Sequence, residues 1–166
     1  MSNRKLIIVV VALVVICAGW YAFRPERLFV NQTVSEQFPV ASAASTADAS
    51  PVALASGDFH NVSHKGSGTA TVYQLANGKR VLRFTNFETS NGPDVVVYLV
   101  AATDAQDADT VKNSDPILLG SLKGNVGEQN YDVPAGVDLN KYRAVTIWCR
   151  RFSANFATAP LMSRQS

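Results

Sequence analysis

Hydrophobic and polar positions follow two different patterns along this chain of 166 residues. Residues 6–23 carry no charge and are almost entirely apolar, which is typical of a helix that crosses a membrane. From Ser56 onward, short apolar or alternating runs are separated by Gly, Asn, Asp and Pro, which is typical of strands joined by turns. The pattern therefore predicts one N-terminal transmembrane helix followed by an all-β domain.

The β domain is expected to contain at least seven short strands. They are predicted at residues 57–60, 68–75, 79–87, 94–101, 117–122, 129–133 and 144–152. The pair Asn77-Gly78 lies between two of these runs and predicts a tight hairpin, because both residues accept positive φ. The run from Val95 to Ala102 is apolar on both faces, which predicts a central strand. So many short strands indicate a β-sandwich or a small barrel, and we take an antiparallel β-sandwich, jelly-roll or immunoglobulin-like, as the predicted fold.

The apolar segment 6–23 is long enough to span a bilayer, since its residues would form a helix of about 27 Å. Cleavage as a signal peptide, or as a lipoprotein signal at Cys17, is the alternative, but bulky residues stand where either needs small ones. We therefore expect a retained signal-anchor in the cell membrane. Residues 1–5 would form a cytoplasmic tail, and the rest of this single-pass chain would be exported.

A connector is expected between this helix and the β domain, at residues 24–55. Its first half carries scattered apolar residues that could lie against the membrane surface or against the domain. Its second half consists mainly of Ala, Ser and Thr, which are too weakly hydrophobic to pack, and this composition predicts a flexible tether. The β domain is accordingly expected at residues 56–166.

Composition and charge exclude several classes of protein. Fifteen Lys and Arg face thirteen Asp and Glu, the net charge is +2 and no block of like charge occurs, so nucleic acid is not expected as a partner. The two cysteines, Cys17 and Cys149, lie in different parts of the chain, which excludes a disulfide framework. Hydrolase, metalloprotease and phosphate-loop motifs are all absent, so a conventional enzyme is not expected.

Cys149 is the best candidate for chemistry, as a redox thiol or as a ligand. Strand alternation places it on one face, and the supporting residues Trp148 and Arg150 on the other. The charge of Arg150 or Arg151 would favour the thiolate if either side chain folded back toward the sulfur. The alternative is a small buried hydrophobe whose thiol is inert.

His60, His64 and Met162 are further candidate ligands. On one extended strand, the two histidines would lie roughly 13 Å apart, too far to share a metal unless a turn closes the gap. Together with Cys149 they are similar to a blue-copper ligand set, although no histidine follows the cysteine. Haem ligation is chemically open, but a C-x-x-C-H attachment motif is absent. No metal site is assigned, and a surface or turn role is the alternative for each histidine.

Two polar segments complete the candidate residues. Asn91 and Asp94 could line a cleft at the start of a strand, although a simple turn fixed by Pro93 explains the same residues. The acidic run DAQDAD, residues 104–109, lacks the spacing of a calcium-binding loop, and we interpret it as solvated.

Several strings of residues carry a resemblance to a known family. The turn NGPD before an apolar strand, then LGSLKGNVGEQNYDVPAGVDL and VTIWCRRFSANFATAPL, resemble in order and spacing the DM-thirteen domain family over residues 56–161. The upstream WYAFRPERLFVN resembles its membrane-tethered bacterial members. The resemblance implies a β-rich extracellular domain proposed to act in electron transfer or thiol redox chemistry through one cysteine, which Cys149 matches. That cysteine would be a free thiol or a ligand to a prosthetic group such as haem.

A second class of function stays open beside this one. The domain could be a non-catalytic extracellular module that presents loops 90–94 and 123–130 to a protein or glycan, with Cys149 merely packed. The sequence names neither the redox partner or cell-surface protein involved nor a cofactor, with haem and copper both open. Solvent access to the sulfur would separate the two classes.

Overall fold

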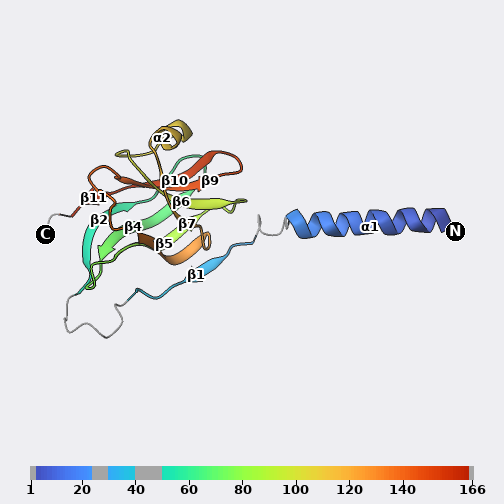
Figure 1. Ribbon diagram of the computed structural model, residues 1–166, viewed down its shortest axis with the longest axis horizontal. Coiled ribbons are helices and arrows are strands. Elements are labelled where there is room, and N and C mark those ends of the chain that lie inside the picture. The colour runs from blue at the N-terminus through green and yellow to red at the C-terminus, as the bar shows by residue number, and fades with distance from the viewer. Residues whose placement is uncertain (1–2, 24–29, 40–49, 165–166) are drawn as a thin grey trace. The chain divides into compact units, whose positions relative to one another are not determined.

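The computed structural model describes residues 3–23, 30–39 and 50–164, and the chain divides into two compact units, Met1–Val30 and Asn31–Ser166 (Figure 1). The first unit contains the helix α1 (Asn3–Phe23). Its side chains from residue 3 to residue 21 are all exposed, and it is long and apolar enough to cross a membrane. A helix that is apolar on every side finds a matching environment in a bilayer.

The described part of the second unit contains eleven strands in two sheets. The first sheet has the order β1-β8-β5-β4-β2-β11, and the second has the order β3-β10-β9-β6-β7. The strands are β1 (Thr33–Ser35), β2 (Val52–Asp58), β3 (His60–Asn61), β4 (Gly66–Gln74), β5 (Arg80–Thr89), β6 (Val95–Val100), β7 (Ile117–Ser121), β8 (Val126–Val133), β9 (Ala144–Cys149), β10 (Ala154–Pro160) and β11 (Met162–Ser163). The expected all-β class with a preceding apolar helix is confirmed.

The main hydrophobic core lies between the two sheets and takes side chains from both. Its centre is a cluster of four aromatic rings whose contacting centroids are 4.8–5.3 Å apart, formed by Phe59, Phe84, Phe87 and Tyr131. From the second sheet, Val145, Ile147 and Cys149 enter the same core. The predicted alternation along β9 is therefore confirmed for its inner face.

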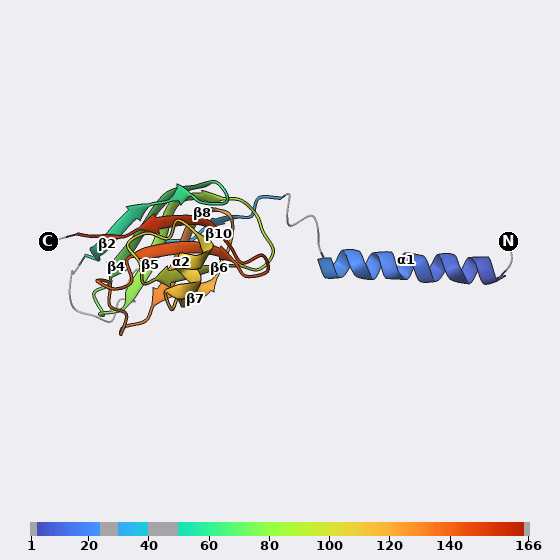
Figure 2. The same cartoon turned by 90° about the horizontal axis from the view of Figure 1, so that it is seen from above.

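The outer face of the second sheet is also buried. The helix α2 (Ala108–Asn113), which lies over this sheet in Figure 2, packs Val111 against Trp148 and the outward-facing residues of β6. Asp107 caps α2, because its Oδ1 accepts a hydrogen bond from the Thr110 N–H at 2.6 Å. The acidic run that we interpreted as solvated thus contains a helix cap, and the helix itself was not predicted.

Two predicted local features are confirmed. β4 and β5 pair antiparallel across the Asn77-Gly78 turn, where Gly78 has a φ of 80°. β6, which begins at Val95, lies between β9 and β7 and is central to its sheet. Both features depend on local sequence, namely a turn that needs positive φ and a run that is apolar on both faces.

Two segments differ from the sequence-based expectation. The strand expected at 144–152 ends at Cys149, and the chain reverses through residues 150–153 into β10, which pairs antiparallel with β9. Ser153 adopts a left-handed φ of 48° in this turn. Residues 33–35, assigned to the connector, form β1 and pair parallel with β8, so the compact unit starts at Asn31 rather than at residue 56. Residues 40–49 of the expected tether lie outside the described residues.

Candidate functional site

Cys149 is the last residue of β9 and is completely buried. Its backbone pairs with Val95 of β6 on one side and with Ala154 of β10 on the other. The Sγ atom donates a hydrogen bond to the carbonyl oxygen of Pro93 at 3.0 Å. The sulfur thus lies in the core, but at the end of its strand, beneath the loop that precedes β6.

Residues 90–94 form this loop, which we call the cover loop. Pro93 supplies the carbonyl that meets the thiol, and a Cβ on Gly92 would lie only 2.8 Å from the Phe156 ring. Glycine is needed here because the loop approaches the aromatic ring so closely. Residues 90–93 are half-buried and Asp94 is exposed, so a single layer of chain separates Cys149 from solvent on this side.

Arg150, in the turn that follows β9, forms hydrogen bonds and an ion pair with Asp94 at the end of the cover loop. Its guanidinium donates from Nε to both carboxylate oxygens of Asp94 at 3.1 Å and from Nη2 to Oδ1 at 2.5 Å. Its backbone N–H also donates to the Asp94 carbonyl at 3.1 Å. The guanidinium charge is therefore directed at a carboxylate, and the sequence-based idea that it would favour a thiolate has no support in this geometry.

The same contacts perturb the ionisation of Asp94. Its pKa is lowered, first by the hydrogen bonds from Arg150 and then by the charges of Arg150 and Arg151, while burial acts in the opposite direction. The pKa of Arg150 is raised by the same hydrogen bonds and by the charge of Asp94. Both groups consequently remain charged at neutral pH, and the ion pair persists.

Trp148 points away from the sulfur. It belongs to the outer face of the second sheet and packs with Val96 and Val111, whereas Cys149 belongs to the core between the sheets. Trp148 therefore supports the strand and not the thiol directly.

The two histidines lie in different environments. His60 of β3 pairs with Thr158, whose hydroxyl meets that of Thr146 at 3.0 Å on the outer face of the sheet. Since paired residues of neighbouring strands point to the same face, His60 faces outward, opposite to Cys149. The His64 ring instead contacts the Phe156 ring, with centroids 3.9 Å apart.

Both ring nitrogens of His60 meet acceptors. Nε2 lies 2.9 Å from Oδ1 of Asp104, and Nδ1 lies 3.1 Å from the Asn61 carbonyl oxygen. Burial lowers the pKa of His60, but these hydrogen bonds and the charge of Asp104 outweigh it and raise the pKa above 6.5. This imidazole is therefore engaged as a structural hydrogen-bond donor.

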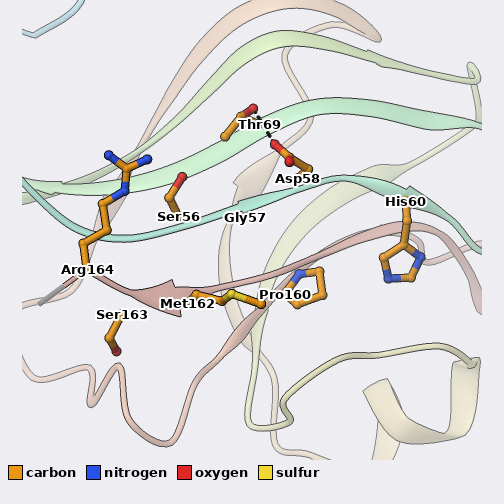
Figure 3. A pocket seen from close by; sticks show the side chains of 9 residues that line it. All are labelled: Ser56, Gly57, Asp58, His60, Thr69, Pro160, Met162, Ser163 and Arg164. Carbon is orange, nitrogen blue, oxygen red and sulfur yellow. Dashed lines mark hydrogen bonds between the residues drawn. The ribbon is translucent and has the colours of Figure 1, made fainter.

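His60 and Met162 do share one feature, an open groove of about 600 Å³ (Figure 3). Gly57 also lines the groove. At this residue β2 approaches β10 so closely that a Cβ would lie 1.8 Å from the Pro160 carbonyl oxygen. The groove is lined by Ser56, Gly57, Asp58, His60, Thr69, Pro160, Met162, Ser163 and Arg164. Met162 is 71% exposed beside it. Cys149 is not among the lining residues, so the structure does not bring the four suggested ligands together.

Within residues 3–23, 30–39 and 50–164, no group of three or more His, Cys, Asp and Glu side chains is placed to hold a metal ion. Next to the sulfur, the structure shows the Pro93 carbonyl oxygen and apolar core side chains. A copper ion ligated by Cys149 would thus need further protein ligands that the described residues do not place beside the sulfur.

Sequence reasoning identified Cys149, Asp94 and Arg150 separately but not as one arrangement. The three meet because β6 and β9 pair antiparallel, which places Val95 opposite Cys149 and so brings the residues around each position together. Asp94 and Arg150 are 56 residues apart, so the strand register that brings them together cannot be read from the local sequence. Only the separate features, an Asp beside a turn and an Arg after a strand, are visible there.

These features define a class of protein, a two-sheet β domain with one thiol at the end of a central strand, beneath a loop. The sequence model of the family described as Electron transfer DM13 matches residues 58–161, which is more than half of the chain. The protein belongs to this family, the DM-thirteen family whose resemblance was noted from its motifs. Neither a curated protein nor a solved structure matches the chain.

Proposed function

We propose that this protein is a membrane-anchored electron-transfer domain that works through the thiol of Cys149. The apolar helix α1 would anchor it, with the N-terminus in the cytoplasm and the β domain outside. The support is the family match, which includes the whole cover loop and Cys149, together with a helix long and apolar enough to span a bilayer.

The position of Cys149 is the single observation that carries the redox role. The thiol ends a central strand and lies under one loop rather than at the middle of the core, so a local movement of residues 90–94 exposes it without unfolding either sheet. While the loop is closed, the S–H group donates to the Pro93 carbonyl. We therefore favour a free thiol over a ligand to a prosthetic group.

The proposed reaction is thiol–disulfide exchange with a disulfide supplied by the partner. With the loop open, Cys149 loses its proton to solvent and its sulfur attacks one sulfur of the partner disulfide. The partner S–S bond breaks, a mixed disulfide to Cys149 forms, and the second partner sulfur leaves as a thiolate that takes up a proton. Cys149 is oxidised and the leaving sulfur is reduced. A further thiol must resolve the mixed disulfide, because the only other cysteine of the chain, Cys17, lies in α1.

The test uses the full chain in detergent with Cys17→Ser, so that Cys149 is the only thiol. The neutral disulfide 4,4′-dithiodipyridine is added, and the release of thiopyridone is followed by its absorbance. Mass spectrometry of the protein confirms the mixed disulfide. We expect one equivalent to be released from the native protein, and none from the variant that also carries Cys149→Ser. Release that occurs only after denaturation would reject the proposal.

A binding module is the second candidate, and one observation favours it. The sulfur is fully buried and its hydrogen-bonding capacity is already satisfied by Pro93, as expected of a packed structural thiol. Loop 90–94 would then be presented to a protein or glycan, whereas residues 126–130 of the second expected loop belong to β8, between β1 and β5. A native protein that is unreactive toward the disulfide and free of visible absorbance and stoichiometric metal would support this function.

A further inference from the structure

We propose that Asp94 and Arg150 form a latch that controls access to Cys149, an inference that rests on the proposed thiol function. Contacts that hold the cover loop closed include Sγ of Cys149 to the Pro93 carbonyl, N–H of Arg150 to the Asp94 carbonyl, and the guanidinium to the Asp94 carboxylate. Only the last is an ion pair at the surface, with side chains 46% and 41% exposed. It is the contact that salt, protonation or an approaching partner can break.

Backbone conformation indicates that the closed state depends on these contacts. Among the described residues, four that are not glycine have a left-handed φ: Asn86, Asp94, Asp115 and Ser153. Two of them flank the thiol, Asp94 at the end of the cover loop with φ 59° and Ser153 in the turn after β9 with φ 48°. Residues held in this region tend to revert when the surrounding contacts are lost. The latch thus joins two segments that are both held away from their preferred conformation.

Strand β9 cannot move to expose the sulfur as the cover loop can. β9 is buried at all six of its positions, with the core on one face and the cluster that contains Trp148 and Val111 on the other. Opening of the strand itself would therefore disrupt two packed layers, whereas opening of residues 90–94 breaks the contacts of one loop, among them the latch, two hydrogen bonds and the contact of Gly92 with Phe156. Access to the sulfur by the loop is the less costly route.

The latch is tested by the rate at which 4,4′-dithiodipyridine modifies Cys149 in the full chain carrying Cys17→Ser. The reagent is neutral, so a change of protein charge does not alter its encounter with the protein. An exposed ion pair of this kind predicts a modest effect, and we expect Asp94→Asn and Arg150→Gln each to accelerate modification about two- to fivefold. The double variant should react no faster than either single variant, because all three lose the same interaction.

Salt and charge reversal separate a latch from a general loss of structure. Raising the salt concentration should accelerate modification of the Cys17→Ser protein and leave the two single variants unchanged, since screening acts on the ion pair. Exchanging the charges, Asp94→Arg with Arg150→Asp, should restore the slow rate. Arg83→Gln is the matched control: Arg83 Nη2 meets Glu128 Oε2 at 2.6 Å in the first sheet, and its loss should not change the rate.

The outcomes distinguish the latch from the function on which it rests. If the parent protein reacts in its native state and the latch variants react at the same rate, the latch is wrong and the thiol function stands. If the latch variants react and the parent does not, the latch is supported and the thiol function of the unassisted native protein is rejected. If none of the native proteins reacts, both proposals are rejected.

Discussion

β5 of the first sheet and β9 of the second are both central strands, yet they are buried in different ways. β5 leaves five of its ten residues exposed or half-exposed, as expected of a strand with one solvated face. β9 is buried at every position, because α2 and the segment before it cover the outer face of its sheet. The strand that carries Cys149 is therefore packed on both faces, and its last residue lies beneath the cover loop.

The largest expected effect comes from the outer face of β9. Trp148→Ala removes a buried indole from the contact with α2 and should lower the free energy of unfolding by about 3–5 kcal/mol. Thr85→Ala on the half-exposed outer face of β5 should change it by no more than about 0.5 kcal/mol. Urea unfolding of the full chain measures both. Equal losses for the two substitutions would contradict the difference between the sheets.

A smaller effect is expected at the cap of α2. Asp107→Ala removes the acceptor for the Thr110 N–H, so the helix should fray and expose Trp148 to water. The fluorescence of Trp148, read in a Trp20→Phe background, should shift to longer wavelength and become more accessible to quenchers. Asp109→Ala is the control, because that side chain is 84% exposed and lies 3.6 Å from Lys112. A shift as large for this control would show that helix capping is not the cause.

The stability of the first sheet should depend on pH through Glu36, the residue that follows β1. Burial acts to raise the pKa of Glu36, but hydrogen bonds from Lys123 and from the Asn130 N–H, with the charge of Lys123, lower it below 4.5. A lowered folded-state pKa means that this stabilisation is present above pH 4.5 and is lost as the pH falls through the folded value. The urea midpoint should fall with acidification in this range, and Glu36→Gln should reduce the slope. An unchanged slope would show that β1 is not held by this carboxylate.

The smallest effect is expected at His60, which lines the groove together with residues of both sheets. The pKa of His60 is raised by its contacts with Asp104, so its stabilisation is complete below pH 6.5 and is lost as the pH rises through the folded value. Asp104→Asn should lower the pKa of His60, as followed by NMR titration of the ring. Asp58→Asn is the matched control, because Asp58 lines the same groove and accepts from Thr69 instead. A pKa of His60 that does not respond to Asp104→Asn would overturn the assignment.

Local patterns predicted a large part of the fold. The apolar run at the N-terminus, the hairpin at Asn77-Gly78, the central strand from Val95 and the inward face of Val145, Ile147 and Cys149 were all expected and are present. Each depends on residues close together in the sequence. The helix α2 was missed, although Asp107 before it has the position of a helix cap.

The sequence by itself determined that an all-β domain follows the apolar helix, which face of β9 turns inward and which cysteine belongs to the β domain. Only the tertiary structure decided that β9 ends at Cys149, that β1 joins the first sheet and that Asp94 meets Arg150. Side-chain periodicity is a local property, whereas strand register is selected by packing between segments far apart in the chain. For this reason the sequence could point to the sulfur but not to the loop that encloses it.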